Sequence, residues 1–141
     1  AIVRNATEAL KTVLYGVPLK AGDEVLTTNH DYSSLVSVIR HREIRDGIKL
    51  VRAEVPAPAE SMDQLVSAFE EAITPRTKLI LVSHIAYLTG QIFPVNLHSR
   101  HFLIRFVTRY RQRSNIRIIL FHCWSRDYNR NEIPVVLLSF R

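Results

Sequence analysis

The residues with the clearest chemical potential lie near the N-terminus, where a short apolar segment, residues 2–3, runs into a helix start. Asn5 and Thr7 are good N-cap residues, and Glu8 places a negative charge in the first helical turn. The free N–H groups of such a helix start lie at the positive end of the helix dipole, so they can bind a phosphate group. Ala6 is small enough for close approach, and the Thr7 hydroxyl can add a hydrogen bond. The same pattern also describes an ordinary capped helix without a ligand.

Two more polar loops follow predicted strands. Residues 29–32 come after a strand at 24–28, and residues 86–94 come after a nearly continuous apolar strand at 78–85. The carboxyl ends of parallel strands meet at one edge of a sheet, and ligands of α/β proteins bind there. We therefore expect both loops to lie beside residues 5–7 and to share one ligand with them.

The elements that position these loops alternate between strand and helix. Ser33 or Ser34 can cap a helix that ends at Gly47, and Ser61 opens a capping box with Gln64. The predicted strands between the helices are residues 24–28, 48–55 and 78–85. This alternation predicts an α/β protein, with three layers (α/β/α) and a mostly parallel sheet.

The composition is that of a globular protein, since 47% of the 141 residues are hydrophobic and 23% are charged. No apolar run approaches the roughly 18 residues of a membrane span. Cys123 is the single cysteine, so the sequence offers no disulfide framework and no cysteine-based metal site. We expect a cytoplasmic protein with no membrane contact and no bound metal.

Charge is distributed unevenly along the chain, whose net charge is +6. Residues 1–95 contain ten Lys or Arg and eleven Asp or Glu. Residues 96–141 contain nine Arg and two acidic residues, and they lack Lys, Ala and Gly. This change of composition predicts two parts, an α/β domain at 1–95 and an Arg-rich divergent tail at 96–141.

Three ordered motifs in residues 1–95 resemble the class V aminotransferases, and within them the isopenicillin N epimerase-like branch. The motifs are NATEA at 5–9, AGDEVLTTNHDY at 21–32, and SHI at 83–85 followed by LTGQIFPV at 88–95. These enzymes use pyridoxal 5′-phosphate (PLP) and have fold type I. The resemblance implies that residues 1–95 are part of the large, PLP-binding domain of a PLP-dependent transferase.

The resemblance also implies cofactor-binding roles for five positions. Ala6 and Thr7 match the turn that holds the cofactor phosphate. His30 matches a position where a ring stacks on the pyridine, and Tyr32 is a neighbouring candidate. His30 can instead be a loop histidine that caps the next helix, and Tyr32 can simply pack on that helix. Tyr87 replaces an Asn that commonly contacts the cofactor's phenolic oxygen, and its own hydroxyl can donate a hydrogen bond.

No catalytic residue is assigned, because the family's catalytic positions are not matched. The Schiff-base lysine lies further along in family members, whereas no Lys follows Lys78. The Asp that pairs with the pyridine nitrogen would follow a strand at 116–121, but the next residues are His-Cys-Trp, and Asp127 comes several residues too late. His84 ends a buried strand and is interpreted as a core histidine.

The resemblance therefore implies a fragment of a PLP enzyme that acts on an amino-acid substrate, as a transaminase, epimerase, desulfurase or desulfhydrase. We expect this chain to be inactive and the intact enzyme to be a homodimer. A shifted reading frame, a retained intron or a gene-model error would explain residues 96–141.

The alternative is a non-catalytic basic module. In it, residues 96–141 would bind nucleic acid or an acidic partner through a cationic helix face. Its arginines are interleaved with aromatic residues, and the set is Arg105, Arg109, Arg111, Arg113 and Arg117 with Phe102, Phe106 and Tyr110. The sequence contains no DNA- or RNA-binding motif, so this alternative rests on charge alone.

Overall fold

The computed structural model describes residues 4–93, 117–121 and 135–139. In chain order the elements are α1 (Ala6–Gly16), β1 (Glu24–Thr28), α2 (Ser33–Asp46), β2 (Lys49–Ala53), α3 (Met62–Ala72), β3 (Thr77–Ser83), β4 (Arg117–Phe121) and β5 (Val135–Ser139). The predicted alternation of strands and helices is confirmed.

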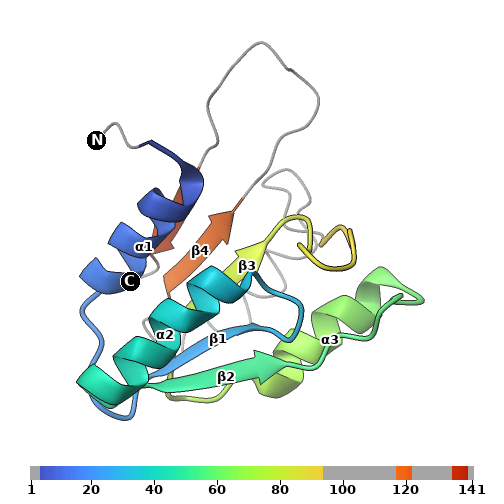
Figure 1. The fold of residues 1–141 in the computed structure, drawn as a ribbon. Coiled ribbons are helices and arrows are strands. Elements are labelled where there is room, and N and C mark those ends of the chain that lie inside the picture. The colour runs from blue at the N-terminus through green and yellow to red at the C-terminus, as the bar shows by residue number, and fades with distance from the viewer. Residues whose placement is uncertain (1–3, 94–116, 122–134, 140–141) are drawn as a thin grey trace.

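These strands form one sheet in the order β2-β1-β3-β4-β5. β1 pairs in parallel with β2 and with β3, and β3 pairs in parallel with β4. β5 runs antiparallel to β4. The predicted mostly parallel sheet is confirmed, and the carboxyl ends of β1 and β3 lie at the same edge (Figure 1).

Helices cover both faces of the sheet, with α1 and α2 on one face and α3 on the other (Figure 1). Side chains that alternate along β1 point to opposite faces, so Val25 packs under α1 and α2 while Leu26 packs under α3. This explains why all five residues of β1 are buried. The cluster on the α1 and α2 side consists of Leu10, Leu14, Val25, Leu35, Val38, Ile39, Ile48, Leu79 and Leu81. The cluster on the α3 side consists of Leu26, Ala53, Val55, Leu65, Phe69, Ile80, Val82, Ala86 and Phe93.

The helix starts follow the sequence at α3 but not at α2. Ser61 caps α3 and accepts the Gln64 N–H at 3.2 Å, as the capping box predicts. At α2 the N-cap is Tyr32, which makes no side-chain capping bond, so the predicted caps Ser33 and Ser34 are wrong. The helix begins directly after Tyr32 because the Tyr32 carbonyl accepts the first helical hydrogen bonds, from the Leu35 N–H at 2.9 Å and the Val36 N–H at 3.2 Å.

The C-terminal end of α2 is set by Gly47, as predicted. Its φ of 70° lies in the left-handed region, which glycine adopts without a steric penalty. A Cβ at this position would also lie 3.1 Å from the Cβ of Ala21. Gly47 therefore serves both the turn and the close approach of the loop before β1.

Several predictions concern residues outside the described ones. They are the apolar segment at 2–3, the basic module's aromatic and Arg residues apart from Arg117 at the start of β4, the His-Cys-Trp segment 122–124, and Asp127. β4 lies where a strand was predicted at 116–121. Among the described residues, no helix is long and apolar enough to cross a membrane.

Candidate functional site

The N-terminus of α1 has the geometry of an anion-binding helix start. Asn5 is the N-cap residue in an extended conformation, and its Oδ1 accepts the Glu8 N–H at 2.9 Å. The first backbone hydrogen bond of the helix runs from the Ala9 N–H to the Asn5 carbonyl at 3.2 Å. The N–H groups of Ala6 and Thr7 precede that bond, so the helix itself leaves them without an acceptor.

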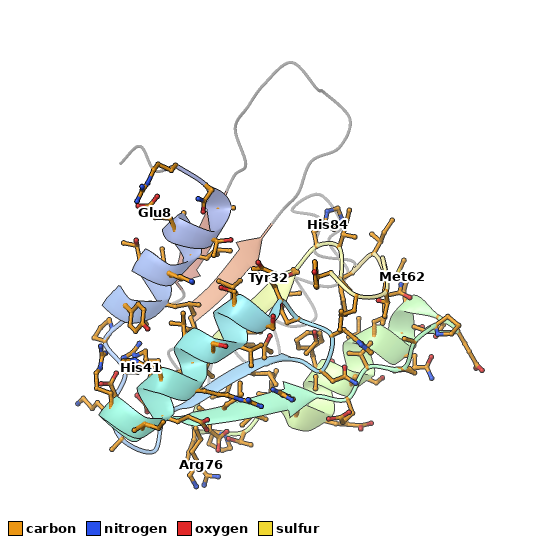
Figure 2. The ribbon with its side chains drawn as sticks, viewed as in Figure 1. Glu8, Tyr32, His41, Met62, Arg76 and His84 are labelled. Atoms are coloured by element: carbon orange, nitrogen blue, oxygen red, sulfur yellow. The ribbon has the colours of Figure 1, made fainter. Side chains whose placement is uncertain are left out.

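Glu8 is the one acidic side chain of this first turn. It turns back to Arg4, whose backbone N–H and Nε lie 3.1 Å and 3.3 Å from its Oε2 (Figure 2). The Arg4 side-chain hydrogen bond lowers the pKa of Glu8, and the Arg4 backbone N–H adds to the effect. This exposed ion pair offsets the carboxylate charge that would otherwise oppose an anion at the helix start.

A cavity of about 500 Å³ opens beside this helix start. It is bounded by α1, the start of α2, the end of β3 and the loop at 84–93. The lining residues are Thr7, Leu10, Tyr32, Leu35, Ser83, Ile85, Ala86, Tyr87 and Gly90. The structure thus brings together three of the five predicted cofactor-binding residues, namely Thr7, Tyr32 and Tyr87, whereas Ala6 and His30 are not in the lining.

The two tyrosines contact each other at the cavity. Their ring centroids lie 5.1 Å apart at an interplanar angle of 67°, an edge-to-face arrangement that aromatic pairs favour. Tyr87 is 66% exposed, so it stands at the open side, while Tyr32 is half-buried at the start of α2 (Figure 2). Together they provide an aromatic wall against which a planar ring can pack.

His30 belongs to the same loop as Tyr32 but contacts a different part of the molecule. Its Nε2 lies 2.8 Å from the Val55 carbonyl oxygen just after β2, and since a carbonyl only accepts, Nε2 must be the donor. The side chain of Asn29 also exchanges two hydrogen bonds with the Val55 backbone. To stack on a ring in the cavity, His30 would have to give up its bond to Val55.

Residues 84–93 form a compact, hydrogen-bonded loop that carries Tyr87. The Phe93 N–H donates to the His84 carbonyl at 2.8 Å, and the Gly90 N–H donates to the Ala86 carbonyl at 2.9 Å. Gly90 has a φ of 68°, a conformation for which glycine is the favourable residue. Phe93 is buried in the core against α3, so the loop is fixed at its far end. His84, labelled in Figure 2, directly follows β3. It is half-buried and is not among the residues that line the cavity.

Asp31 has no role that its sequence pattern predicts, although its side chain bonds two residues that line the cavity. It is only 7% exposed, and its carboxylate accepts hydrogen bonds from Thr27, Tyr32 and Ser83. The available signal was an Asp placed directly between a strand and a helix, and such residues commonly bond nearby backbone N–H groups. Its partner Ser83 lies far away in the sequence, so that contact could not be foreseen.

The described residues offer no group of three or more His, Cys, Asp or Glu that could hold a metal ion. The polar groups at the cavity are instead hydroxyls and the N–H groups of α1. The site therefore suits an anion joined to a planar ring.

Residues 2–102 match the aminotransferase class-V family, which is well over half of the chain, and the chain belongs to this family. It is 32% identical over 101 residues to isopenicillin N epimerase of Amycolatopsis lactamdurans and 28% identical over 94 residues to that of Streptomyces clavuligerus. Each match covers 67% of this chain and 24% of the relative. A probable cysteine desulfurase of Vibrio cholerae is 27% identical over 95 residues, covering 65% and 23%. The chain thus spans about a quarter of the length of these curated relatives.

Solved structures share the fold. The complex of the cystine C-S lyase C-DES with its reaction product cysteine persulfide superposes with a TM-score of 0.68 at 22% identity, covering 86% of this chain and 30% of the lyase. A variant of C-DES with glycine covalently linked to its PLP cofactor gives a TM-score of 0.67 at 23% identity, over the same shares. Homologues in this family bind PLP and act on amino-acid substrates.

The residues of this chain fit such a cofactor. At the cavity, the open N–H group and the hydroxyl of Thr7 can hold its phosphate, and the open N–H group of Ala6 lies one residue before them at the same helix start. The Tyr32 and Tyr87 rings can pack against its pyridine ring. The cavity volume lies within the range of about 300–1,000 Å³ that is usual for small-molecule sites.

Proposed function

We propose that residues 1–95 are part of the cofactor-binding domain of a PLP-dependent enzyme that acts on an amino acid, as a transaminase, epimerase, desulfurase or desulfhydrase. The observation that carries this proposal is the cavity that joins the open helix start at Thr7 to the aromatic pair Tyr32 and Tyr87. Membership of the class-V family supports it.

In this proposal each described residue has a limited task. Ala6 and Thr7 hold the phosphate through backbone N–H groups, and Thr7 adds its hydroxyl. Tyr32 and Tyr87 pack against the ring and exclude water from one side of it. Bound PLP supplies an electron-withdrawing ring for reactions at the carbon that bears the amino group of the substrate.

We further propose that this chain binds PLP without completing catalysis. No Lys follows Lys78 in the sequence, and within the described part of the chain no Lys lines the cavity. The covalent attachment that such enzymes use therefore has no partner at this cavity. The proposal extends to a homodimeric intact enzyme in the cytoplasm, with residues 96–141 as a divergent tail.

The test measures binding of pyridoxamine 5′-phosphate and of pyridoxamine to the full chain by equilibrium dialysis. These probes lack the aldehyde of PLP, so they do not react with surface lysines. The phosphorylated probe should bind more tightly, and Thr7→Val should weaken it by about tenfold, because a hydrogen bond to a charged group is lost. Thr7→Val keeps the branched shape of the side chain and removes only the hydroxyl.

The matched control is Thr12→Val on the same helix. The Thr12 hydroxyl donates to the Glu8 carbonyl at 2.9 Å, and Thr12 does not line the cavity. Its loss should leave the affinity for the probe unchanged. Equal binding of the two probes, or equal effects of the two valine variants, would refute the phosphate-binding role of the helix start.

A further inference from the structure

Asp31 is a buried acidic residue at the edge of the sheet where the cavity opens. Its side chain accepts three hydrogen bonds, from Thr27 Oγ1 at 2.7 Å, from Ser83 Oγ at 2.8 Å and from the Tyr32 N–H at 2.7 Å. The residue is 7% exposed, and Thr27 is fully buried. A carboxylate so placed needs these donors, because its burial without them would be very unfavourable.

The three donors come from three separate parts of the fold. Thr27 belongs to β1, Ser83 is the last residue of β3, and Tyr32 leads into α2. Among the described residues no ion pair involves Asp31, so its hydrogen-bond donors there are all uncharged. Asp31 therefore fixes the ends of two strands and the start of a helix relative to one another.

Two of those donors, Ser83 and Tyr32, also line the cavity. A serine hydroxyl has one hydrogen to donate and two lone pairs that accept. Because the Ser83 hydrogen is directed to Asp31, only the lone pairs of its oxygen remain for a ligand. A ligand atom that forms a hydrogen bond with the Ser83 hydroxyl must consequently be the donor.

Resting on the proposed function, we propose that Asp31 is a positioning residue that turns Ser83 into a dedicated acceptor for a cationic N–H group of the ligand in the cavity. The carboxylate behind the hydroxyl strengthens this acceptor, because hydrogen bonds in a chain polarise one another. The ligand class is thus an anion at Thr7 joined to a protonated nitrogen at Ser83. Tyr32, held by the same carboxylate, supplies the wall between them.

The test compares two probes on the full chain, with affinities from amide NMR titrations. Inorganic phosphate reports on the helix start alone, whereas pyridoxamine 5′-phosphate carries the phosphate, the ring and protonated nitrogens. Ser83→Ala should weaken pyridoxamine 5′-phosphate by about tenfold, because a hydrogen bond to a charged group is lost. It should leave the affinity for inorganic phosphate unchanged.

Variants of Asp31 separate positioning from general structure. The Tyr32 N–H and the Ser83 hydroxyl both bond Oδ1 of Asp31, whereas Thr27 bonds Oδ2. Asp31→Asn can keep an oxygen at the Oδ1 position, so Ser83 keeps its acceptor and most of the affinity for pyridoxamine 5′-phosphate should remain. Asp31→Ala removes that oxygen and should lose as much as Ser83→Ala. Thr27→Val removes the third donor away from the cavity, so it should lower stability without changing the ratio of the two affinities.

Different outcomes separate the two proposals. If the wild-type chain binds neither probe, the proposed function fails, and this inference fails with it. If both probes bind but Ser83→Ala leaves their affinity ratio unchanged, only the role of Ser83 and Asp31 is refuted. The role of Ser83 and Asp31 is likewise refuted if Thr27→Val changes the ratio of the two affinities as much as Ser83→Ala does.

Discussion

Arg42 on α2 offers a sharp test of how the helix that carries Thr7 is held in place. Its side chain is 5% exposed, and its Nη1 donates to the Leu14 carbonyl at 2.7 Å and to the Val17 carbonyl at 3.0 Å. These carbonyls belong to the C-terminal end of α1, where a helix has no internal donors for its last carbonyl groups. Nε of Arg42 also contacts Asp46 at 2.6 Å. Arg42 thus joins α1 to α2.

Replacement of Arg42 by Met keeps most of the apolar bulk and removes all of these donors. Two buried carbonyl oxygens would lose their partner, at about 1–3 kcal/mol for each unsatisfied group. Asp46 would keep Arg45, whose hydrogen bonds are the largest cause of its strongly lowered pKa, followed by those of Arg42. We therefore expect a loss of about 3 kcal/mol in the free energy of unfolding, most of it from the carbonyls.

Urea unfolding followed by circular dichroism measures this loss. With a urea dependence of about 1.5 kcal/mol/M, the midpoint should fall by about 2 M. Arg45→Met is the matched control, because Arg45 contacts the same Asp46 carboxylate but is half exposed and bonds no α1 carbonyl. It should stay close to the wild type. If the two methionine variants lose the same stability, the carbonyl contacts contribute nothing and the reasoning is wrong.

Three further predictions concern the fold around the site. Burial alone would raise the pKa of Glu24, but hydrogen bonds from Thr74, Arg76 and Thr77 lower it below its ordinary 4.5. The stabilising contribution of the Glu24 carboxylate is therefore present above pH 4.5 and is lost as the pH falls through its lower pKa in the folded state. Urea unfolding should show that Glu24→Gln lowers the free energy of unfolding at neutral pH and lowers it less in acid. Gly90→Ala should lower the free energy of unfolding by about 1 kcal/mol, because its φ of 68° is unfavourable for alanine although the added Cβ would enter open space. Gly16→Ala, at a position without a positive φ, should show no such loss in the same urea unfolding experiment. Phe69→Ala should lower the free energy of unfolding by about 3–5 kcal/mol, because this ring is fully buried. Met62→Ala on the same helix should leave the free energy of unfolding close to that of the wild type, because Met62 is 54% exposed.

The alternation of strands and helices was predictable because it depends on local signals. Ser61 and Gln64 begin α3 through a bond between neighbours in sequence, and Gly47 ends α2 through its own backbone conformation. Apolar runs such as that of β3 indicate a strand covered on both faces. Each of these features is decided within a few residues, so the sequence pattern is sufficient.

The start of α2 shows where a local pattern fails, because neither of the serines that the pattern favours is the N-cap residue. Serines are good caps in general, but here the Tyr32 carbonyl accepts the Leu35 and Val36 N–H groups, so α2 begins directly after Tyr32. The loop before Tyr32 is held by Asp31, which bonds the Tyr32 N–H and accepts hydrogen bonds from Thr27 and Ser83. Ser83 lies on a strand more than fifty residues away, so no local pattern contains that information.

By itself, then, the sequence determined the α/β class, the helix start around Thr7 and the resemblance to the class V aminotransferases. The first two depend on local chemistry, and the third depends on ordered motifs. Only the tertiary structure decided that Thr7, Tyr32 and Tyr87 share one cavity while His30 bonds to Val55. It also decided that Asp31 joins β1, β3 and α2. Such contacts exist because parallel strands bring their carboxyl ends to one edge, where residues remote in sequence must satisfy one another's hydrogen bonds.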